Sequence, residues 1–386
     1  MINIKEEIEQ LRLQSNLRII PNVDKKIGKN IYIDGQPMIN FSSNDYLGLG
    51  NNKLLVDEFL ETKGNDFQFL FSSTSARLLS GTSRIYNQLE QNLAKMFGKD
   101  SALLFNTGYQ CNLGVVSSIV KRGDVVFCDK LNHASIIDGI KLSGADFYRY
   151  KHLDYDNLEY LLQKNRNNYK RAIIISESVF SMDGDIADIQ KLIELKKRYN
   201  SLLFVDEAHA FGIWGGNLSG ISQLGNYVND IDIISATLGK SFASMGAFVV
   251  ANSELITYIT NKARSFIFST ALPPVNILWS NWLLEEKLEL LKLQSNKLQD
   301  LIKKTHDYLL SSDIKTPSST QIVPIVIGDN EKTVVIAEKL QALGNFVLPI
   351  RPPTVAPNSS RLRLSLCANM EFEDVKKVID MVKNEI

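Results

Sequence analysis

Continuous apolar runs separated by stretches of helical length dominate the middle of the chain. Between about residues 84 and 250 these runs are ALLFN, DVVFC, AIIISE, LLFVDE, DIISA and GAFVVA. Apolar runs of this length are typical of strands buried on both faces, and strands that alternate with helices favour a parallel sheet. The pattern therefore predicts an α/β fold with a doubly wound, mainly parallel sheet.

The two ends of the chain have a different pattern. Residues 2 to about 18 have amphipathic helical spacing, and the stretch IYIDGQPMINF predicts two short strands around an Asp34-Gly35 turn. Pro273-Pro274 can open a helix, and the Leu-, Glu- and Lys-rich stretch from Leu278 to about Leu310 predicts a long one.

Shorter runs follow the long helix. QIVPIVIG, a helix near residues 331–342, NFVLPI, RLRLSLC and a final helix predict a small α+β domain. We therefore expect an N-terminal segment, a large domain and a small C-terminal domain, with the bounds 1–48, 49–285 and 286–386.

Composition excludes several classes of protein. Lys plus Arg and Asp plus Glu number 43 each, so no excess of positive charge favours nucleic acid. The three cysteines are far apart, which predicts neither a zinc site nor a disulfide framework. The first twenty residues lack the apolar block of a signal peptide, and no run has the apolar length that spans a bilayer. We expect a cytoplasmic protein with no membrane segment and no metal.

The run LLFVDEAHAFG places Asp206 directly after an apolar stretch, at the carboxyl end of a predicted strand. Open α/β sheets bind their ligands at that edge, although an Asp there could equally cap the next helix. The letters DEAH and the later GKS at 239–241 also resemble parts of an ATPase. A phosphate-binding loop of that class needs a glycine where Ile234 stands, and the two motifs come in the reverse order. We therefore reject the ATPase interpretation.

A lysine, an acid and a helix start together favour pyridoxal-type cofactor chemistry. Lys240 follows Gly239, and the 34 positions between Asp206 and Lys240 leave room for one further strand. The lysine can form an imine and the acid can hold a ring nitrogen. Gly108 opens a predicted helix whose first amides could bind a phosphate, and Thr237 could add a hydroxyl donor.

Two of the four histidines lie in polar loops that follow predicted strands. These are His133 and His209, which we expect near the site, whereas we expect His152 and His306 at the surface. Arg363 alternates with Arg361 on the strand RLRLSL. A guanidinium that binds a carboxylate is expected in an enzyme acting on amino acids, although a solvated strand edge would give the same pattern.

Nine segments of the chain resemble the α-oxoamine synthases. They are NFSSNDYLGL, LLSGTSRIYNQLE, LLFNTGYQCNLG, DKLNHASIIDG, ESVFSMDGDIADI, VDEAHAFG, TLGKSF, FIFSTALPP and IRPPTVAPNSSRLRLSL. The resemblance runs in order from about residue 18 to 370. It implies a pyridoxal-phosphate (PLP)-dependent transferase of fold type I, with a mainly parallel sheet in the large domain, and a homodimer with active sites at the interface.

The resemblance also implies roles for individual residues. Lys240 would carry PLP as a Schiff base, Asp206 would pair with the ring nitrogen, His133 would stack on the ring, and His209 would reach the phenolic oxygen. The other implied cofactor contacts are Gly108, Tyr109, Ser181, Thr237 and, from the neighbouring subunit, Thr270. The implied substrate contacts are Asn44 and Arg363 for the amino acid carboxylate, Arg18 and Thr354 for the acyl group, and His133.

Within the family, IRPPTV is similar to the members that join L-alanine to a pimeloyl group carried on coenzyme A or on a carrier protein. Sister reactions on glycine or serine, an ordinary aminotransferase and a non-catalytic subunit are the alternatives. Such subunits commonly lose the lysine, which is present here. The chain departs from the family at FSSTSARLLSG, at Tyr86 and at APNSSR, which concern the acyl channel and the interface more than the cofactor.

Overall fold

The computed structural model describes residues 3–385, which form two compact units. Unit 1 contains the chain up to Lys53, Ser181–Asp185 and the residues from Gln294 onward. Unit 2 contains Leu54–Phe180 and Ile186–Leu293. The N-terminal residues, which we expected to form a segment of their own, thus group by contact with the C-terminal residues.

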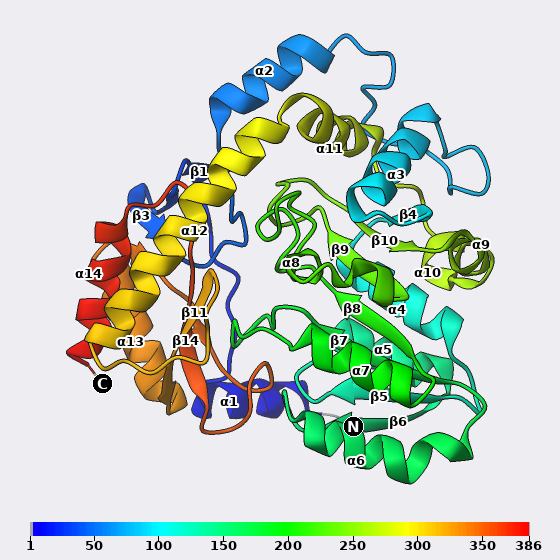
Figure 1. Cartoon of the computed structure of the whole chain (residues 1–386). Coiled ribbons are helices and arrows are strands. Elements are labelled where there is room, and N and C mark those ends of the chain that lie inside the picture. Colours follow the sequence, from blue (N-terminus) through cyan, green and yellow to red (C-terminus); the bar gives the residue numbers. More distant parts are fainter. Residues whose placement is uncertain (1–2, 386) are drawn as a thin grey trace. The chain divides into compact units, whose positions relative to one another are not determined.

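Unit 2 is built on a seven-stranded sheet in the order β4-β10-β9-β8-β7-β5-β6. Only β10 is antiparallel to its neighbours, so the other six strands point the same way. The prediction of a mainly parallel sheet is confirmed, and Figure 1 shows β7, β8 and β9 side by side. The strands are β4 (Ser101–Phe105), β5 (Val125–Asp129), β6 (Asp146–Tyr150), β7 (Ala172–Glu177), β8 (Leu202–Asp206), β9 (Ile233–Thr237) and β10 (Ala247–Ala251).

Helices connect these strands and carry polar caps at several of their first turns. The Thr107 side chain caps α4 by accepting from the Gln110 N–H, and Asp188 caps α7 in the same way. The helices of unit 2 are α2 (Lys53–Lys63), α3 (Arg84–Phe97), α4 (Gly108–Ile119), α5 (Ala134–Ser143), α6 (Tyr155–Asn165), α7 (Ile189–Arg198), α8 (Ile221–Leu224), α9 (Ser253–Lys262), α10 (Arg264–Ile267) and α11 (Pro274–Glu286), with short 3-10 turns at Arg166–Asn168 and Tyr227–Asp230.

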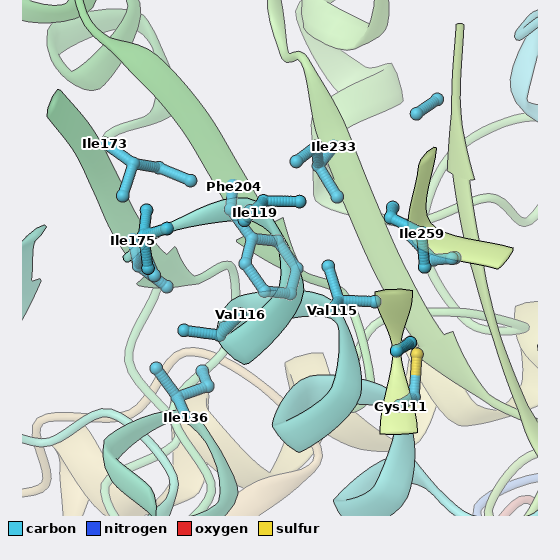
Figure 2. Packing of buried hydrophobic residues seen from close by; sticks show 14 of the residues in the cluster. Cys111, Val115, Val116, Ile119, Ile136, Ile173, Ile175, Phe204, Ile233 and Ile259 are labelled. Atoms are coloured by element: carbon cyan, nitrogen blue, oxygen red, sulfur yellow. The ribbon is translucent and has the colours of Figure 1, made fainter. Parts of the chain in front are cut away.

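The core of unit 2 lies between α4 and the sheet. Val115 and Ile119 of α4 belong to one buried cluster with Phe204 of β8 and Ile233 of β9, and Figure 2 shows these side chains together. Because interiors are close-packed, this contact fixes where the first turn of α4 lies. That turn opens beside the carboxyl ends of the strands.

Unit 1 contains two small sheets. The first has the order β1-β2-β3-β12. Its three N-terminal strands pair antiparallel, and β12 pairs parallel with β3. The second has the order β11-β14-β13 and is antiparallel. The strands are β1 (Lys25–Ile27), β2 (Asn30–Ile33), β3 (Gln36–Asn40), β11 (Ile322–Gly328), β12 (Asn345–Phe346), β13 (Pro349–Ile350) and β14 (Ser360–Ser365). The helices are α1 (Ile4–Leu13), α12 (Leu288–Ser311, from Gln294 onward in this unit), α13 (Asn330–Ala342) and α14 (Phe372–Lys383).

Three details differ from the sequence-based expectations. The long helix predicted after Leu278 is two helices, α11 and α12, because Lys287 leaves helical geometry at φ −120° and ψ 15°. The polar edge strand β6 was not predicted, since its sequence DFYRY has no apolar run. His152 and His306 are half-buried and not at the surface, as His152 pairs with buried Asp129 and His306 with the Thr320 carbonyl.

Within residues 3–385, no helix has the length and apolar character needed to cross a membrane. The same residues contain no group of three or more His, Cys, Asp or Glu side chains placed to hold a metal ion.

The α4–sheet core predicts a large effect for Phe204→Ala. Phe204 is fully buried, so its truncation leaves a cavity and should lower the free energy of unfolding by about 3–5 kcal/mol. Leu224→Ala is the control, because Leu224 is 60% exposed and should change stability by less than about 0.5 kcal/mol. Urea unfolding followed by circular dichroism measures both, and equal effects would contradict this description of the core.

Candidate active site

Three polar residues meet where β7, β8 and β9 end. In the sheet register Glu177 of β7 lies opposite Asp206 of β8, and Asp206 lies opposite Ser235 of β9. All three are buried, with exposures of 3%, 5% and 2%. Since the strands are parallel, their carboxyl ends share one edge, which is the ligand edge of open α/β sheets.

Asp206 is held by donors on both of its oxygens. Asn112 on α4 donates from Nδ2 to Oδ2 over 2.7 Å, and the Ala208 N–H donates to Oδ1 over 2.9 Å. Asn112 is itself buried, so the α4 core contact fixes the side chain that orients the carboxylate. The first helix after Asp206 is α8, which begins at Ile221, so Asp206 is not a helix cap, which was the alternative left open by the sequence.

Lys240 and His209 lie within hydrogen-bond distance of each other. Lys240 Nζ is 2.9 Å from His209 Nε2. The loop that carries His209 is anchored by Glu207, which accepts hydrogen bonds from the Ser178 hydroxyl and from both the N–H and the hydroxyl of Ser222. Burial raises the pKa of Glu207 and these donors offset part of that rise.

His133 occupies the N-cap of α5. Its backbone N–H donates to Glu177 Oε1 over 2.6 Å, and its ring lies edge-on to Tyr109 at a centroid distance of 6.4 Å. Burial lowers the pKa of His133, and the nearby Lys240 acts in the same direction while Asp206 opposes it. The imidazole is therefore favoured in its neutral form.

The predicted phosphate-binding residues lie at the start of α4 and after β9. A Cβ added to Gly108 would meet only Thr237, at 3.8 Å, so the helix start and Thr237 are neighbours. Tyr109 is 44% exposed and donates its hydroxyl to Asp138. The Thr237 hydroxyl already donates to the Gly246 carbonyl over 2.9 Å and accepts from the Gly239 N–H over 3.1 Å. Its single hydrogen is thus in use within the turn.

Thr270 is exposed. It forms an isolated β-bridge with Ala76, and its carbonyl accepts a hydrogen bond from Asn106 over 2.7 Å.

In unit 1, Arg363 is 8% exposed and has neutral hydrogen-bond partners. It donates to the Ser181 carbonyl over 2.6 Å and to the Ser365 hydroxyl over 2.6 Å. Asn44 Oδ1 lies 3.3 and 3.4 Å from its two terminal nitrogens, and the Tyr46 hydroxyl also contacts it. The structure thus brings together Asn44, Arg363 and the backbone of Ser181. These partners orient the guanidinium without cancelling its charge.

A second arginine site of unit 1 joins the N-terminal arm to the IRPPTV segment. Arg18 donates to the Thr354 hydroxyl over 2.8 Å, so these two predicted acyl contacts do meet. Arg351 donates to the Ser15 carbonyl and lies near enough to Arg18 for the two positive charges to repel. Burial first and Arg18 second lower the pKa of Arg351. A pair of neighbouring guanidinium groups is suited to an anion.

Sequence reasoning missed Glu177, Asn112, Ser135 and Arg351. Glu177 ends the apolar run AIIISE just as Asp206 ends LLFVD, so the same strand-end signal could have found it. Arg351 stands inside the quoted block IRPPTV. Asn112 and Ser135 carry no such signal, because a polar residue within a helix is ordinarily exposed.

Comparisons with known proteins agree with this geometry. Residues 36–382 match the aminotransferase class I and II family. A Haemophilus influenzae protein, provisionally named 8-amino-7-oxononanoate synthase, is 44% identical over 97% of this chain and 98% of its own. A Neisseria gonorrhoeae protein with the same provisional name is also 44% identical, with the same coverage.

Two kinds of solved structure are similar throughout. Serine palmitoyltransferase from S. paucimobilis, solved with a PLP–myriocin aldimine, has a TM-score of 0.89 at 25% identity and covers 99% of this chain and 96% of its own. 8-Amino-7-oxononanoate synthase from Francisella tularensis has a TM-score of 0.73 at 28% identity, covering 90% of this chain and 97% of its own.

The chain belongs to the aminotransferase class I and II family, and within it to the α-oxoamine synthases. It is an enzyme with the PLP-dependent transferase fold, and the family and the PLP-bound structures support PLP as its cofactor.

The buried Glu177 predicts a dependence of stability on pH. Burial, with a further contribution from Asp206, raises the pKa of Glu177 well above its ordinary value of 4.5, although Lys240 and the His133 N–H lower it in part. The stabilising contribution of a raised pKa is complete below pH 4.5 and is lost as pH rises through the folded-state pKa. Glu177→Gln stays neutral at both pH values and keeps an acceptor for the His133 N–H. The free energy of unfolding of the variant minus that of wild type should therefore be larger at pH 8 than at pH 5.

Urea unfolding of the cofactor-free protein at both pH values measures this effect. Glu338→Gln on α13 is the control, because Glu338 is exposed and should give the same difference from wild type at either pH. A Glu177→Gln variant that behaves like the control would refute the assignment.

Proposed function

We propose that the protein condenses L-alanine with a pimeloyl thioester of coenzyme A or a carrier protein, with loss of CO₂. The products are 8-amino-7-oxononanoate, CO₂ and the free thiol, and the reaction takes place in the cytoplasm. The observation that carries this choice of acyl group is the arginine pair of Arg18 and Arg351 beside Thr354. A pimeloyl group ends in a carboxylate that two guanidinium groups can bind, whereas a palmitoyl chain has no such end. The 44% identity to proteins given this name, against 25% to serine palmitoyltransferase, supports the same choice.

The residues of unit 2 fit PLP. Lys240 supplies an amine, buried Asp206 supplies an acid fixed by two donors, and the start of α4 supplies unpaired amides beside Gly108 and Tyr109. Thr237 would have to exchange its bond with Gly246 in order to donate to a phosphate. When bound, PLP supplies an electron-accepting ring that eases the loss of the α-proton and of CO₂.

Lys240 has two duties in this proposal. Its Nζ would hold the cofactor and, once the amino acid is bound, would take the α-proton as a general base. His209 Nε2, 2.9 Å away, restrains Nζ and can afterwards contact the phenolic oxygen. Asp206 would keep a proton on the ring nitrogen, and His133 would cover one face of the ring.

Residues of unit 1 would bind the substrates. Arg363 and Asn44 are assigned to the carboxylate of alanine, because Arg363 is pre-oriented by neutral partners and retains its charge. Ser181, whose carbonyl orients Arg363, is assigned a hydroxyl contact to the cofactor. Arg18, Arg351 and Thr354 would bind the far end of the acyl group.

A homodimer is part of the proposal. Six large apolar side chains of unit 2 are between 51% and 85% exposed: Phe67, Leu70, Phe71, Leu78, Leu79 and Phe268. They lie in the sequence segments that flank Ala76 and Thr270, which form a β-bridge. Exposed apolar residues grouped in this way favour coverage by another chain, and Thr270 would then reach the cofactor phosphate of the neighbouring subunit.

Lys240→Ala should abolish turnover, because the covalent tether and the base are removed together. Borohydride reduction of the wild-type holoenzyme followed by peptide mapping should mark Lys240. Lys262→Ala, at the exposed end of α9, is the control and should keep full activity. A reduced cofactor on any other lysine would disprove the assignment.

The arginine pair predicts a preference for pimeloyl-coenzyme A over succinyl- and acetyl-coenzyme A. The measurement is kcat/KM with alanine and with glycine. Each buried methylene of the longer chain contributes about 0.8 kcal/mol. Arg18→Met should lower kcat/KM for pimeloyl-coenzyme A by about ten- to a hundredfold, because a hydrogen-bonded charge pair is lost. The ω-methyl ester of the same donor should be affected much less.

Arg12→Met on the exposed face of α1 is the matched control. A preference for acetyl-coenzyme A with glycine, or for palmitoyl-coenzyme A with serine, would overturn the choice of substrates and leave the family assignment intact.

A further inference from the structure

A buried chain of hydrogen bonds links Asp206 to His133 through two side chains that the proposed reaction does not use. Asn112 Nδ2 lies 2.7 Å from Asp206 Oδ2 and 3.1 Å from Ser135 Oγ. Ser135 Oγ in turn lies 2.7 Å from His133 Nδ1. Asn112 is 3% exposed and Ser135 is fully buried, so water does not compete for these bonds.

The carboxylate sets the direction of the whole chain. Carboxylate oxygens accept hydrogen bonds, so the Asn112 atom that faces Asp206 must be the amide nitrogen. The opposite orientation would place the Asn112 oxygen against a negative charge. It would also place the amide nitrogen beside the Ser235 hydroxyl, which in the observed orientation donates to Asn112 Oδ1 over 2.9 Å. Asn112 therefore donates to both Asp206 and Ser135.

Ser135 sets the direction of the bonds at His133. Its Oγ accepts from Asn112 and keeps its own hydrogen, within reach of His133 Nδ1 at 2.7 Å. The Ser135 backbone N–H donates to His133 Nδ1, over 3.3 Å. Because this N–H points at Nδ1, Nδ1 acts as an acceptor and carries no hydrogen, and the Ser135 hydroxyl then donates to it as well. In a neutral imidazole the proton must then be on Nε2.

We propose that Asn112 and Ser135 are positioning residues that hold His133 as the tautomer with its proton on Nε2. The importance of His133 for turnover rests on the proposed function, whereas the tautomer rests on the hydrogen bonds alone. A ring held in this way offers a bound molecule a hydrogen-bond donor and not a base. The lowered pKa of His133, caused mainly by burial, agrees with a ring that stays neutral.

The charges around the ring act on the pKa of His133 in both directions. Asp206 and Asp138 raise it and Lys240 lowers it, and burial is the largest effect. Asp206 is also linked to the ring by hydrogen bonds through Asn112 and Ser135. Proton removal from the substrate is then left to Lys240.

Nuclear magnetic resonance of the histidine nitrogens tests the proposal. The full-length protein is loaded with PLP and labelled with ¹⁵N-histidine, and the His133 signals are identified by their loss in His133→Gln. At neutral pH we expect a pyridine-type signal for Nδ1 and a pyrrole-type signal for Nε2. A pyrrole-type Nδ1, an equal mixture of tautomers or a doubly protonated ring would overturn the proposal.

Two variants separate positioning from mere packing. Asn112→Ala removes the donor that polarises the Ser135 hydroxyl and so weakens its bond to Nδ1, and the ratio of the Nε2–H to the Nδ1–H tautomer should fall by up to roughly fivefold, the equivalent of one lost hydrogen bond. Ser135→Ala leaves only the backbone donor and should lower the ratio in the same direction. Ser143→Ala, whose hydroxyl bonds to Ile140 at the other end of α5, is the control and should leave the ratio unchanged.

Unchanged tautomer ratios in both folded variants would also overturn the proposal that Asn112 and Ser135 position His133. If either variant fails to fold, the wild-type spectrum still decides, since it reports the tautomer directly. Condensation assays on the same samples keep the two proposals distinct. Absence of turnover together with the expected wild-type spectrum would refute the proposed reaction and leave the proposed tautomer of His133 intact.

Discussion

The parallel pairing of β7, β8 and β9 is the constraint on which the rest of the site depends. It forces the carboxylates of Glu177 and Asp206 into neighbouring buried positions. Two negative charges on neighbouring strands repel strongly where little water reaches them. The fold accommodates them with Lys240, with donors on each carboxylate and with a raised pKa at Glu177. The cluster of polar groups is thus a direct consequence of the topology of the sheet.

Much of this arrangement could be predicted from the sequence. The apolar runs identified all but one strand of the large sheet, and Asp206 was placed at its carboxyl edge because strand ends in parallel sheets coincide. β6 was missed because an edge strand needs no apolar run. The break at Lys287 was missed because apolar spacing continues through it.

The supporting polar residues were beyond reach for a different physical reason. The contact between Asn112 and Ser135 arises because α4 and α5 pack against each other. Side chains that meet across two helices have no fixed spacing in the sequence. Arg363 was found as one of two arginines on a predicted strand, but its neutral partners include Ser181 and Asn44, which are distant along the chain. The sequence identifies reactive groups more readily than the groups that orient them.

The parallel pair between β3 and β12 has a consequence for the order in which the two units fold during synthesis. Asn40 near the N-terminus pairs with Phe346, so the first sheet of unit 1 lacks its last strand until most of the chain has left the ribosome. Closing so long a loop is slow, because the ends must meet before any contact rewards them. All of unit 2 is synthesised by Leu293 and can pack earlier. The N-terminal strands therefore keep an unpaired edge until Phe346 has been made, and such an edge can bind chaperones or wrong partners.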